Sequence, residues 1–256
     1  MKRILVIFIV LVMMIGCTEK IENTDYIEKE ETNQLLIVTD YWPPFVFDTN
    51  RGVTTEIVLA AFNETDIDVV IELYPWERCL QMVQNNLAFG SFPWTETEIR
   101  KGTYKFSKPL IYQKTILVYL EDEIIDDFTV EEIFRSDYRI GVLESYQYLE
   151  VLETLNINLD YSTSELDALE KLINKRVDFV VMDKNNAFYL LEDNYPEYVS
   201  KMGVTPIEEF SYWLSLLMGK DYPNVDEILE KFNDGMDKIH ENGVYDDILE
   251  KYEQEE

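Results

Sequence analysis

Runs of apolar residues with two different periods alternate along most of this chain. Short, nearly continuous apolar runs predict strands over residues 35–40 (LLIVTD), 68–74 (DVVIELY) and 88–92 (AFGSF). Between these runs, apolar residues at helical spacing predict helices over residues 54–63 and 76–85. Because strands and helices that alternate in this way form βα units, the first part of the chain is predicted to be a mainly parallel sheet flanked by helices.

A second set of elements follows after an apolar strand-like run, TILVYL. The same two periods predict strands over residues 115–120, 139–143, 177–182, 201–207 and 212–218, and helices over residues 146–155, 165–174, 225–241 and 244–252. The pattern therefore predicts an α/β fold with two sheet-and-helix units of similar element order.

The N-terminus has the layout of an export signal. Twelve apolar residues (4–15) follow Met-Lys-Arg and end at Gly16-Cys17. That run is too short to span a bilayer, which takes roughly 20 residues, and a basic start with a small residue at the end is typical of a removable signal. MIGC (14–17) resembles the lipobox of diacylated lipoproteins, although the usual first residue is Leu. The alternative is a secretory signal or uncleaved anchor in which Cys17 is incidental, and both interpretations predict export.

The charge and cysteine content of the exported part exclude several kinds of partner and cofactor. Residues 1–16 are predicted to be the signal and residues 17–33, which are rich in carboxylates, an acidic tether. The chain has 22 basic and 51 acidic residues, and removal of Lys2 and Arg3 would leave 20 basic residues and a net charge of −31. Such a surface repels nucleic acid and anionic headgroups. With Cys17 lipidated, only Cys79 remains, so neither an intramolecular disulfide nor a thiolate metal cluster is possible, and we expect no metal or other cofactor.

Several segments in order resemble one family. They are DYWPPFVF, Gly52 opening a helix, FPWTETEIRKGTYKFSKPLIY (92–112), RIGVLESYQ, KRVDFVVMD and HENGVYDDILEKY. Over about residues 34–252 the chain resembles the family 3 extracellular solute-binding proteins of ABC transporters, the type that binds polar amino acids. The resemblance implies the type II periplasmic binding protein fold, with two α/β lobes, each a mainly parallel sheet flanked by helices, joined by two crossing strands. It implies lobe 1 at 34–116 and 213–256, lobe 2 at 117–212, and crossings near 115–120 and 207–213.

Arg100 is conspicuous in a chain with few cations. A planar guanidinium can hold both oxygens of a carboxylate with two parallel hydrogen bonds. Through Thr97 and Arg100 the chain matches the Thr-x-x-Arg position of the family. The resemblance implies that Arg100 binds the carboxylate of the ligand and that the Thr95 hydroxyl assists. The alternative is that Arg100 pairs with Glu96 or Glu98 on a solvated helix.

Asp183 carries the complementary charge. It follows an apolar strand directly, which places it at the carboxyl end of a parallel strand, where open α/β sheets bind ligands. The resemblance implies that Asp183 meets the α-amino group of the ligand. The alternative is an N-cap of the helix that follows, because Asp is a preferred capping residue.

Other candidate ligand-binding residues come from the ends of strands. Asp40 and Trp42 end the first strand, where the resemblance implies that Trp42 covers the aliphatic part of a ligand; core packing is the alternative. Asp40 could reach a distal polar or cationic group, and loop capping is the alternative. Trp94, Ser145 and Tyr146 stand where the family usually has small polar residues. They predict a more aromatic pocket in which Ser145 keeps an oxygen near the carboxylate.

Enzymatic chemistry has little support in the sequence. The lone His240 lies in a helix among charged residues, and no nucleophile paired with a base accompanies it. We therefore expect a monomeric, lipid-anchored binding protein on the periplasmic or extracellular face of the membrane, which delivers a small solute, an amino acid, to an ABC permease. The alternatives are a binding module of an envelope sensor and an enzyme similar to cyclohexadienyl dehydratases, because the same fold hosts both.

Replacement of Cys17 by Ser is expected to abolish incorporation of a labelled fatty acid in a bacterial host, because the thiol is the predicted site of acylation. Cys79→Ser is the matched control and should keep the label. A wild-type protein that takes up no label would show that the lipoprotein interpretation is wrong.

Overall fold

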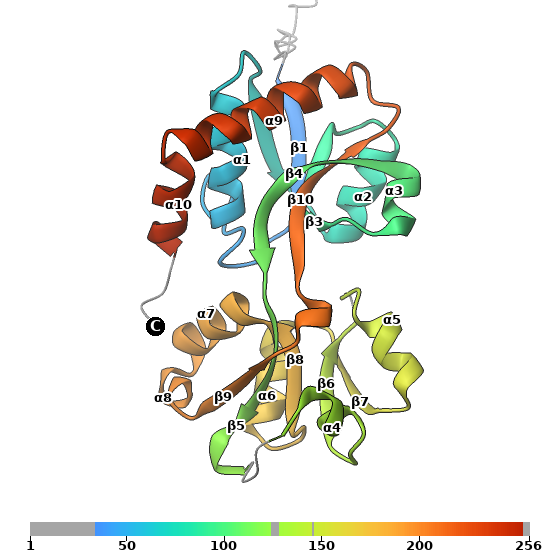
Figure 1. The fold of residues 1–256 in the computed structure, drawn as a ribbon, viewed down its shortest axis with the longest axis vertical. Helices are drawn as coiled ribbons and strands as arrows, with labels where there is room; N and C mark the ends of the chain where they lie inside the picture. The colour runs from blue at the N-terminus through green and yellow to red at the C-terminus, as the bar shows by residue number, and fades with distance from the viewer. Residues whose placement is uncertain (1–33, 124–127, 145, 253–256) are drawn as a thin grey trace, which may run out of the picture. The chain divides into compact units, whose positions relative to one another are not determined.

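The computed structural model describes residues 34–123, 128–144 and 146–252, which form two five-stranded sheets flanked by helices (Figure 1). Cys17, the predicted signal and tether, and Ser145 lie outside the described residues.

The first sheet is built from both ends of the described chain. Its strand order is β2-β1-β3-β10-β4. β1 pairs in parallel with β2 and β3, whereas β10 runs antiparallel to both β3 and β4. The strands are β1 (Leu35–Thr39), β2 (Val69–Leu73), β3 (Gly90–Thr95), β4 (Tyr104–Gln113) and β10 (Tyr212–Gly219).

The second sheet comes from the middle of the chain, in the order β7-β6-β8-β5-β9. β6 pairs in parallel with β7 and β8, and β5 runs antiparallel to β8 and β9. Both sheets are therefore mixed: β10 and β5, next to the crossings, run against their neighbours, and the other strands of each sheet run in one direction. The strands are β5 (Thr115–Leu120), β6 (Arg139–Leu143), β7 (Asn158–Ser162), β8 (Phe179–Asp183) and β9 (Met202–Pro206).

The chain crosses between the sheets twice. It leaves the first sheet after Gln113 and enters the second at Thr115, and it returns through a 3₁₀ turn, η3 (Glu208–Phe210), to Tyr212. Thr115 and Ile116 already pair with β8 of the second sheet, and Tyr212 already pairs with Gln113 of the first. The first crossing therefore comes two residues before the expected boundary, and the second crossing comes one residue before it. We propose residues 34–114 and 212–252 as the first lobe and residues 115–211 as the second.

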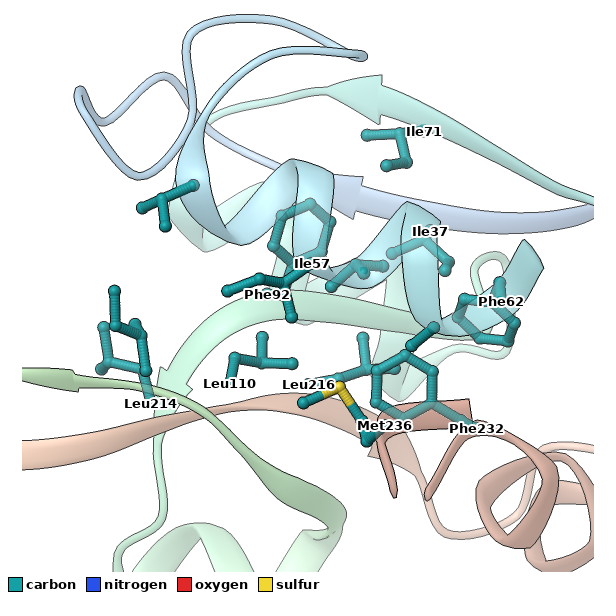
Figure 2. Packing of buried hydrophobic residues seen from close by; sticks show 14 of the residues in the cluster. Ile37, Ile57, Phe62, Ile71, Phe92, Leu110, Leu214, Leu216, Phe232 and Met236 are labelled. Atoms are coloured by element: carbon teal, nitrogen blue, oxygen red, sulfur yellow. The ribbon is translucent and has the colours of Figure 1, made fainter. Parts of the chain in front are cut away.

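Side chains that alternate along the strands pack against helices on both faces of the first sheet. Ile37 packs with α1 and α9 on one face, and Val38 packs with α2 on the other, because successive side chains of a strand point to opposite faces. Figure 2 shows Ile37, Phe92 and Leu216 gathered with side chains of α1 and α9. The helices of this lobe are α1 (Val53–Asn63), α2 (Trp76–Gln84), α3 (Glu98–Thr103), α9 (Val225–Glu241) and α10 (Val244–Tyr252).

The second sheet has the same construction. Ile116 and Val118 pack with α6 and α7, whereas Leu117 faces the side chains of α4 and α5. In the part of the chain that the structure describes, no helix has the length and apolarity needed to cross a membrane. The helical elements of this lobe are η1 (Glu121–Glu123), α4 (Val130–Phe134), α5 (Leu149–Leu152), η2 (Glu153–Leu155), α6 (Glu165–Ile173), α7 (Lys184–Asn194), α8 (Pro196–Val199) and η3.

Two local predictions in the second lobe were wrong. The helix expected over residues 146–155 begins only at Leu149, because the amide of Tyr146 bonds to the Leu143 carbonyl and closes a turn directly after β6. Tyr146 therefore lies in a loop. The strand β7 was not predicted, because its sequence, NLDYS, has a short and mostly polar pattern.

Gly235 marks the closest approach of α9 to α1. A Cβ at this position would overlap with the carbonyl oxygen of Ala61. We expect Gly235→Ala to lower the free energy of unfolding by about 1–3 kcal/mol, measured by urea denaturation, because two backbones would have to separate.

Gly102, in α3, is the matched control. No atom lies within 4 Å of a Cβ built there, so Gly102→Ala should be neutral or stabilising, by up to ~1 kcal/mol. Equal effects of the two substitutions would contradict the close packing of α1 and α9.

Candidate functional site

A cavity of about 300 Å³ lies between the lobes and is lined by residues of both. This volume suits a small metabolite. The side chains that bear on its chemistry are Trp42, Trp76, Glu77, Trp94, Thr95, Arg100, Gln113, Tyr146, Gln147 and Glu165.

The strands explain why these residues meet. Trp42 follows β1, Thr95 ends β3, Tyr146 follows β6, and Glu165 comes shortly after β7. In each lobe the strands concerned are parallel, so their carboxyl ends lie along one edge of the sheet. The cavity is therefore formed by the carboxyl edges of two sheets.

Arg100 is held in place by its own helix and by β3. Thr97 caps α3 and accepts a hydrogen bond from the Arg100 amide at 3.2 Å. Nη1 of Arg100 donates to the Thr95 carbonyl at 2.9 Å, and Cζ lies 4.8 Å from the centre of the Trp94 ring. Burial lowers the pKa of Arg100, but an arginine remains charged at physiological pH. The site therefore presents a fixed, partly desolvated cation.

The surface ion pairs that were the alternative for Arg100 belong to its neighbour. Lys101 Nζ lies 2.6 Å from Glu96 and 3.1 Å from Glu98. In the described ranges, no carboxylate lies within ion-pair distance of Arg100. Its guanidinium is thus free to bind an anion from outside the protein.

Aromatic rings form one continuous surface of the site, which we call the aromatic wall: Trp94, Trp76, Trp42 and Tyr146. The ring centres of Trp94 and Trp76 are 5.0 Å apart, those of Trp76 and Trp42 are 6.3 Å apart, and those of Trp42 and Tyr146 are 6.3 Å apart, each pair nearly perpendicular. Edge-to-face contacts of this kind fix the rings against one another. The wall runs from Arg100 on the first lobe to the second lobe.

Tyr146 connects the lobes at the end of this wall. Its hydroxyl accepts a hydrogen bond from Trp42 Nε1 at 3.1 Å and donates one to Glu165 Oε1 at 3.0 Å. Burial, reinforced by the charge of Glu165, raises the pKa of Tyr146 well above its ordinary value. The phenol therefore keeps its proton and acts as the donor to Glu165.

Asp183 ends β8 and is fully buried, and it does not line the cavity. Oδ1 accepts the Asn186 amide at 2.8 Å and caps α7, whereas Oδ2 has no hydrogen-bond partner among the described residues. Burial raises the pKa of Asp183 to about 7, the amides of Asn186 and Asn185 counteract this, and the charge of Glu165 adds to it. The capping role is observed, and the ligand role stays a prediction.

A contact between the lobes lies beside Asp183. Asn186 Nδ2 donates to the Pro43 carbonyl at 2.6 Å, and the rings of Phe47 and Tyr189 are centred 5.2 Å apart. Together with the bond between Trp42 and Tyr146, these contacts hold the two lobes against each other on one side of the cavity.

Asp40 lies outside the cavity. Its Oδ2 accepts the Trp76 amide at 3.0 Å and its Oδ1 accepts the Tyr41 amide at 2.8 Å, so it caps the start of α2. The loop-capping alternative therefore describes its place in the structure. Arg78, near the same helix start, is exposed.

Of the lining residues named above, sequence reasoning missed five: Trp76, Glu77, Gln113, Gln147 and Glu165. Glu165 could not be placed at the edge of the sheet without β7. The helix predicted from residue 165 is confirmed, because Ser164 caps α6 by accepting the Asp167 amide at 3.2 Å. No cluster of three or more potential metal ligands occurs in residues 34–123, 128–144 and 146–252.

A family model described as "Bacterial extracellular solute-binding proteins, family 3" matches residues 35–255. A Campylobacter jejuni protein named "Probable histidine-binding protein" is 25% identical over 266 residues, and the match covers 100% of both chains.

Solved structures share the fold. The arginine-, lysine-, histidine-binding protein of Geobacillus stearothermophilus is 18% identical, with 87% of this chain and 96% of that chain covered and a TM-score of 0.70. A histidine kinase sensor domain with similarity to periplasmic binding proteins is 17% identical, with 86% and 95% covered and a TM-score of 0.73. These likenesses confirm the predicted two-lobed α/β fold.

The raised pKa of Asp183 predicts a distinct pH dependence. Below about pH 4 this carboxyl is protonated in folded and unfolded chains alike. Between about pH 4 and 7 the unfolded chain ionises while the folded chain keeps the proton, so its contribution to the free energy of unfolding falls as pH rises. Asp183→Asn keeps the side-chain cap of α7 but has no carboxyl to titrate, so the variant does not lose free energy of unfolding in this way as the pH rises. In urea denaturation without ligand, we expect the variant to gain on the order of 2–4 kcal/mol relative to wild type between pH 4 and 8.

Asp221→Asn, at an exposed position, is the matched control and should follow the wild type at every pH. A difference between Asp183→Asn and wild type that is constant with pH would contradict the proton held by Asp183.

Proposed function

Because the chain belongs to the bacterial extracellular solute-binding proteins of family 3, we propose that it captures an amino acid outside the cytoplasm by closing its two lobes over it. It is a binding protein, and its ligand leaves unchanged. The observation that supports the proposal most directly is the place of Arg100 in the cavity without an anionic partner among the described residues.

The guanidinium of Arg100 lies in the cavity on the face of Trp94, and its one acceptor among the described residues is the Thr95 carbonyl. Partial burial of a cation without an anion is unfavourable, and a bound carboxylate would offset that cost. The flat fork of the side chain suits the two oxygens of a carboxylate, and Thr95 lines the same cavity. Arg100 and Thr95 therefore form the proposed carboxylate subsite, under the rings of Trp42 and Trp94.

The second lobe offers acceptors on the other side. Gln147 Oε1 and Asp183 Oδ2 are buried without hydrogen-bond partners in the described ranges, and Glu165 accepts only the Tyr146 hydroxyl. Oxygens of this kind suit the N–H groups of an ammonium. A solute with both a carboxylate and an ammonium is an amino acid, and the names of the histidine-binding and arginine-, lysine-, histidine-binding relatives support this class.

Asp183 would meet the α-amino group once Tyr146 moves aside. The family resemblance implies that Ser145 and Tyr146 complete this side of the site. Asp40, on the first lobe, holds the start of α2 by accepting the Trp76 amide.

Lipid attachment at Cys17 and delivery to an ABC permease complete the proposal. Cys17 follows a twelve-residue apolar run that starts after two cations, and the family is extracellular. The likeness to a sensor domain, which concerns the fold alone, keeps an envelope sensor as the second candidate. Neighbouring genes for a permease and an ATPase would favour transport, and a receptor kinase gene would favour sensing.

A thermal-shift screen over amino acids, opines and small carboxylates tests the ligand class. A ligand at 100 times its dissociation constant should stabilise the folded protein by ~2.7 kcal/mol. We expect amino acids to stabilise it and their decarboxylated counterparts to have no effect. Stabilisation by a decarboxylated amine alone would overturn the proposal.

Arg100→Ala should weaken amino-acid binding by about 2–5 kcal/mol in calorimetry, because it removes the partner of a desolvated charge. Arg100→Lys should restore only part of the affinity, since an ammonium lacks the planar fork. Lys101→Ala, the neighbour with exposed ion pairs, is the control and should bind normally. Binding by folded Arg100→Ala within twofold of wild type would remove Arg100 from the site.

A further inference from the structure

The cavity carries more negative charge than a neutral amino acid would balance. Its charged lining residues are one cation, Arg100, and two carboxylates, Glu77 and Glu165. Glu77 is exposed and screened by water, whereas Glu165 is half-buried. If Arg100 takes the carboxylate of the ligand and Asp183 takes its α-ammonium, as proposed above, Glu165 is left without a cation.

Glu165 lies across the aromatic wall from Arg100. The Arg100 guanidinium contacts Trp94, and three further ring contacts, through Trp76 and Trp42 to Tyr146, lead to the hydroxyl that donates to Glu165. The two charges therefore belong to different lobes and to opposite ends of this surface. An indole face attracts cations as well as aliphatic chains, so the wall suits a ligand whose chain ends in a positive charge.

The hydrogen bond of Tyr146 shows that Glu165 accepts a donor from another residue that lines the cavity. In this conformation the phenol supplies that donor. A neutral hydroxyl does not compensate the charge of a half-buried carboxylate as a cation does. A cationic group of the ligand could share Glu165 with Tyr146 or replace it.

We propose that Glu165 binds a second, cationic group of the ligand, so that the solute is an amino acid with a positively charged side chain. With such a ligand, the charges of Arg100 and Glu165 are each met by an opposite charge of the bound molecule, and the α-ammonium remains for Asp183. This inference rests on the proposed function and narrows it to one class of amino acid.

Pairs of ligands with nearly the same shape test the inference. L-Arginine and its neutral isostere L-citrulline form one pair, and L-lysine and L-norleucine form the other. For wild type we expect the cationic member of at least one pair to bind roughly tenfold to 100-fold more tightly in calorimetry, as for a hydrogen bond between charged groups. Glu165→Gln should lose most of this preference while it keeps its affinity for the neutral member.

Asp221→Asn is the matched control, because it removes one negative charge at an exposed position outside the cavity. It should keep the cationic preference, and this separates a contact of Glu165 from the general attraction of an acidic protein for cations. Unliganded melting temperatures of both variants check that the fold is intact.

The outcomes separate this inference from the proposed function. If wild type binds neutral amino acids as tightly as cationic ones, or if Glu165→Gln keeps the preference, the role of Glu165 is overturned while amino-acid binding stands. If no ligand with a carboxylate binds, the proposed function itself is wrong.

Discussion

One guanidinium, that of Arg100, lies in the cavity without an anionic partner among the described residues. Arg100 is fixed by the Thr95 carbonyl beneath it and the Trp94 ring beside it, and neither of these compensates its charge with an anion. Partial burial without a counterion costs free energy that a bound carboxylate can offset. The cap at Thr97, the end of β3 and the packing of Trp94 on Trp76 all hold this cation in position.

The second lobe contributes oxygen atoms that can accept hydrogen bonds from a ligand. Glu165, Gln147 and Asp183 lie at or near the carboxyl ends of β7, β6 and β8, and the parallel pairing of these strands brings them to one edge. Their acceptors are only partly satisfied by the protein, through the Tyr146 hydroxyl and the first turn of α7. Donors on one lobe and acceptors on the other favour a ligand with opposite charges at its two sides.

Much of this could be predicted from the sequence, and the failures have physical reasons. The period of the apolar residues predicted most strands and helices. Five of the candidate ligand-binding residues named from the sequence line the cavity: Arg100, Thr95, Trp42, Trp94 and Tyr146. Glu165 was missed because β7 is mostly polar, so the strand that positions it gave no apolar run. Asp40 was interpreted from its place after a strand, but local amides of Tyr41 and Trp76 satisfy both its oxygens, which only coordinates reveal.

Charge composition alone could not point to Arg100, but its position in the cavity does. Many of the described lysines and arginines form ion pairs with carboxylates. Lys108, Lys231 and Lys251 tie α9 and α10 to neighbouring elements through Asp237, Asp66 and Glu56. Lys101 takes the carboxylates that flank Arg100 in sequence. Arg100 forms no ion pair with a described residue, and it lies against Trp94 inside the cavity. That position leaves its guanidinium open to an anion from solution.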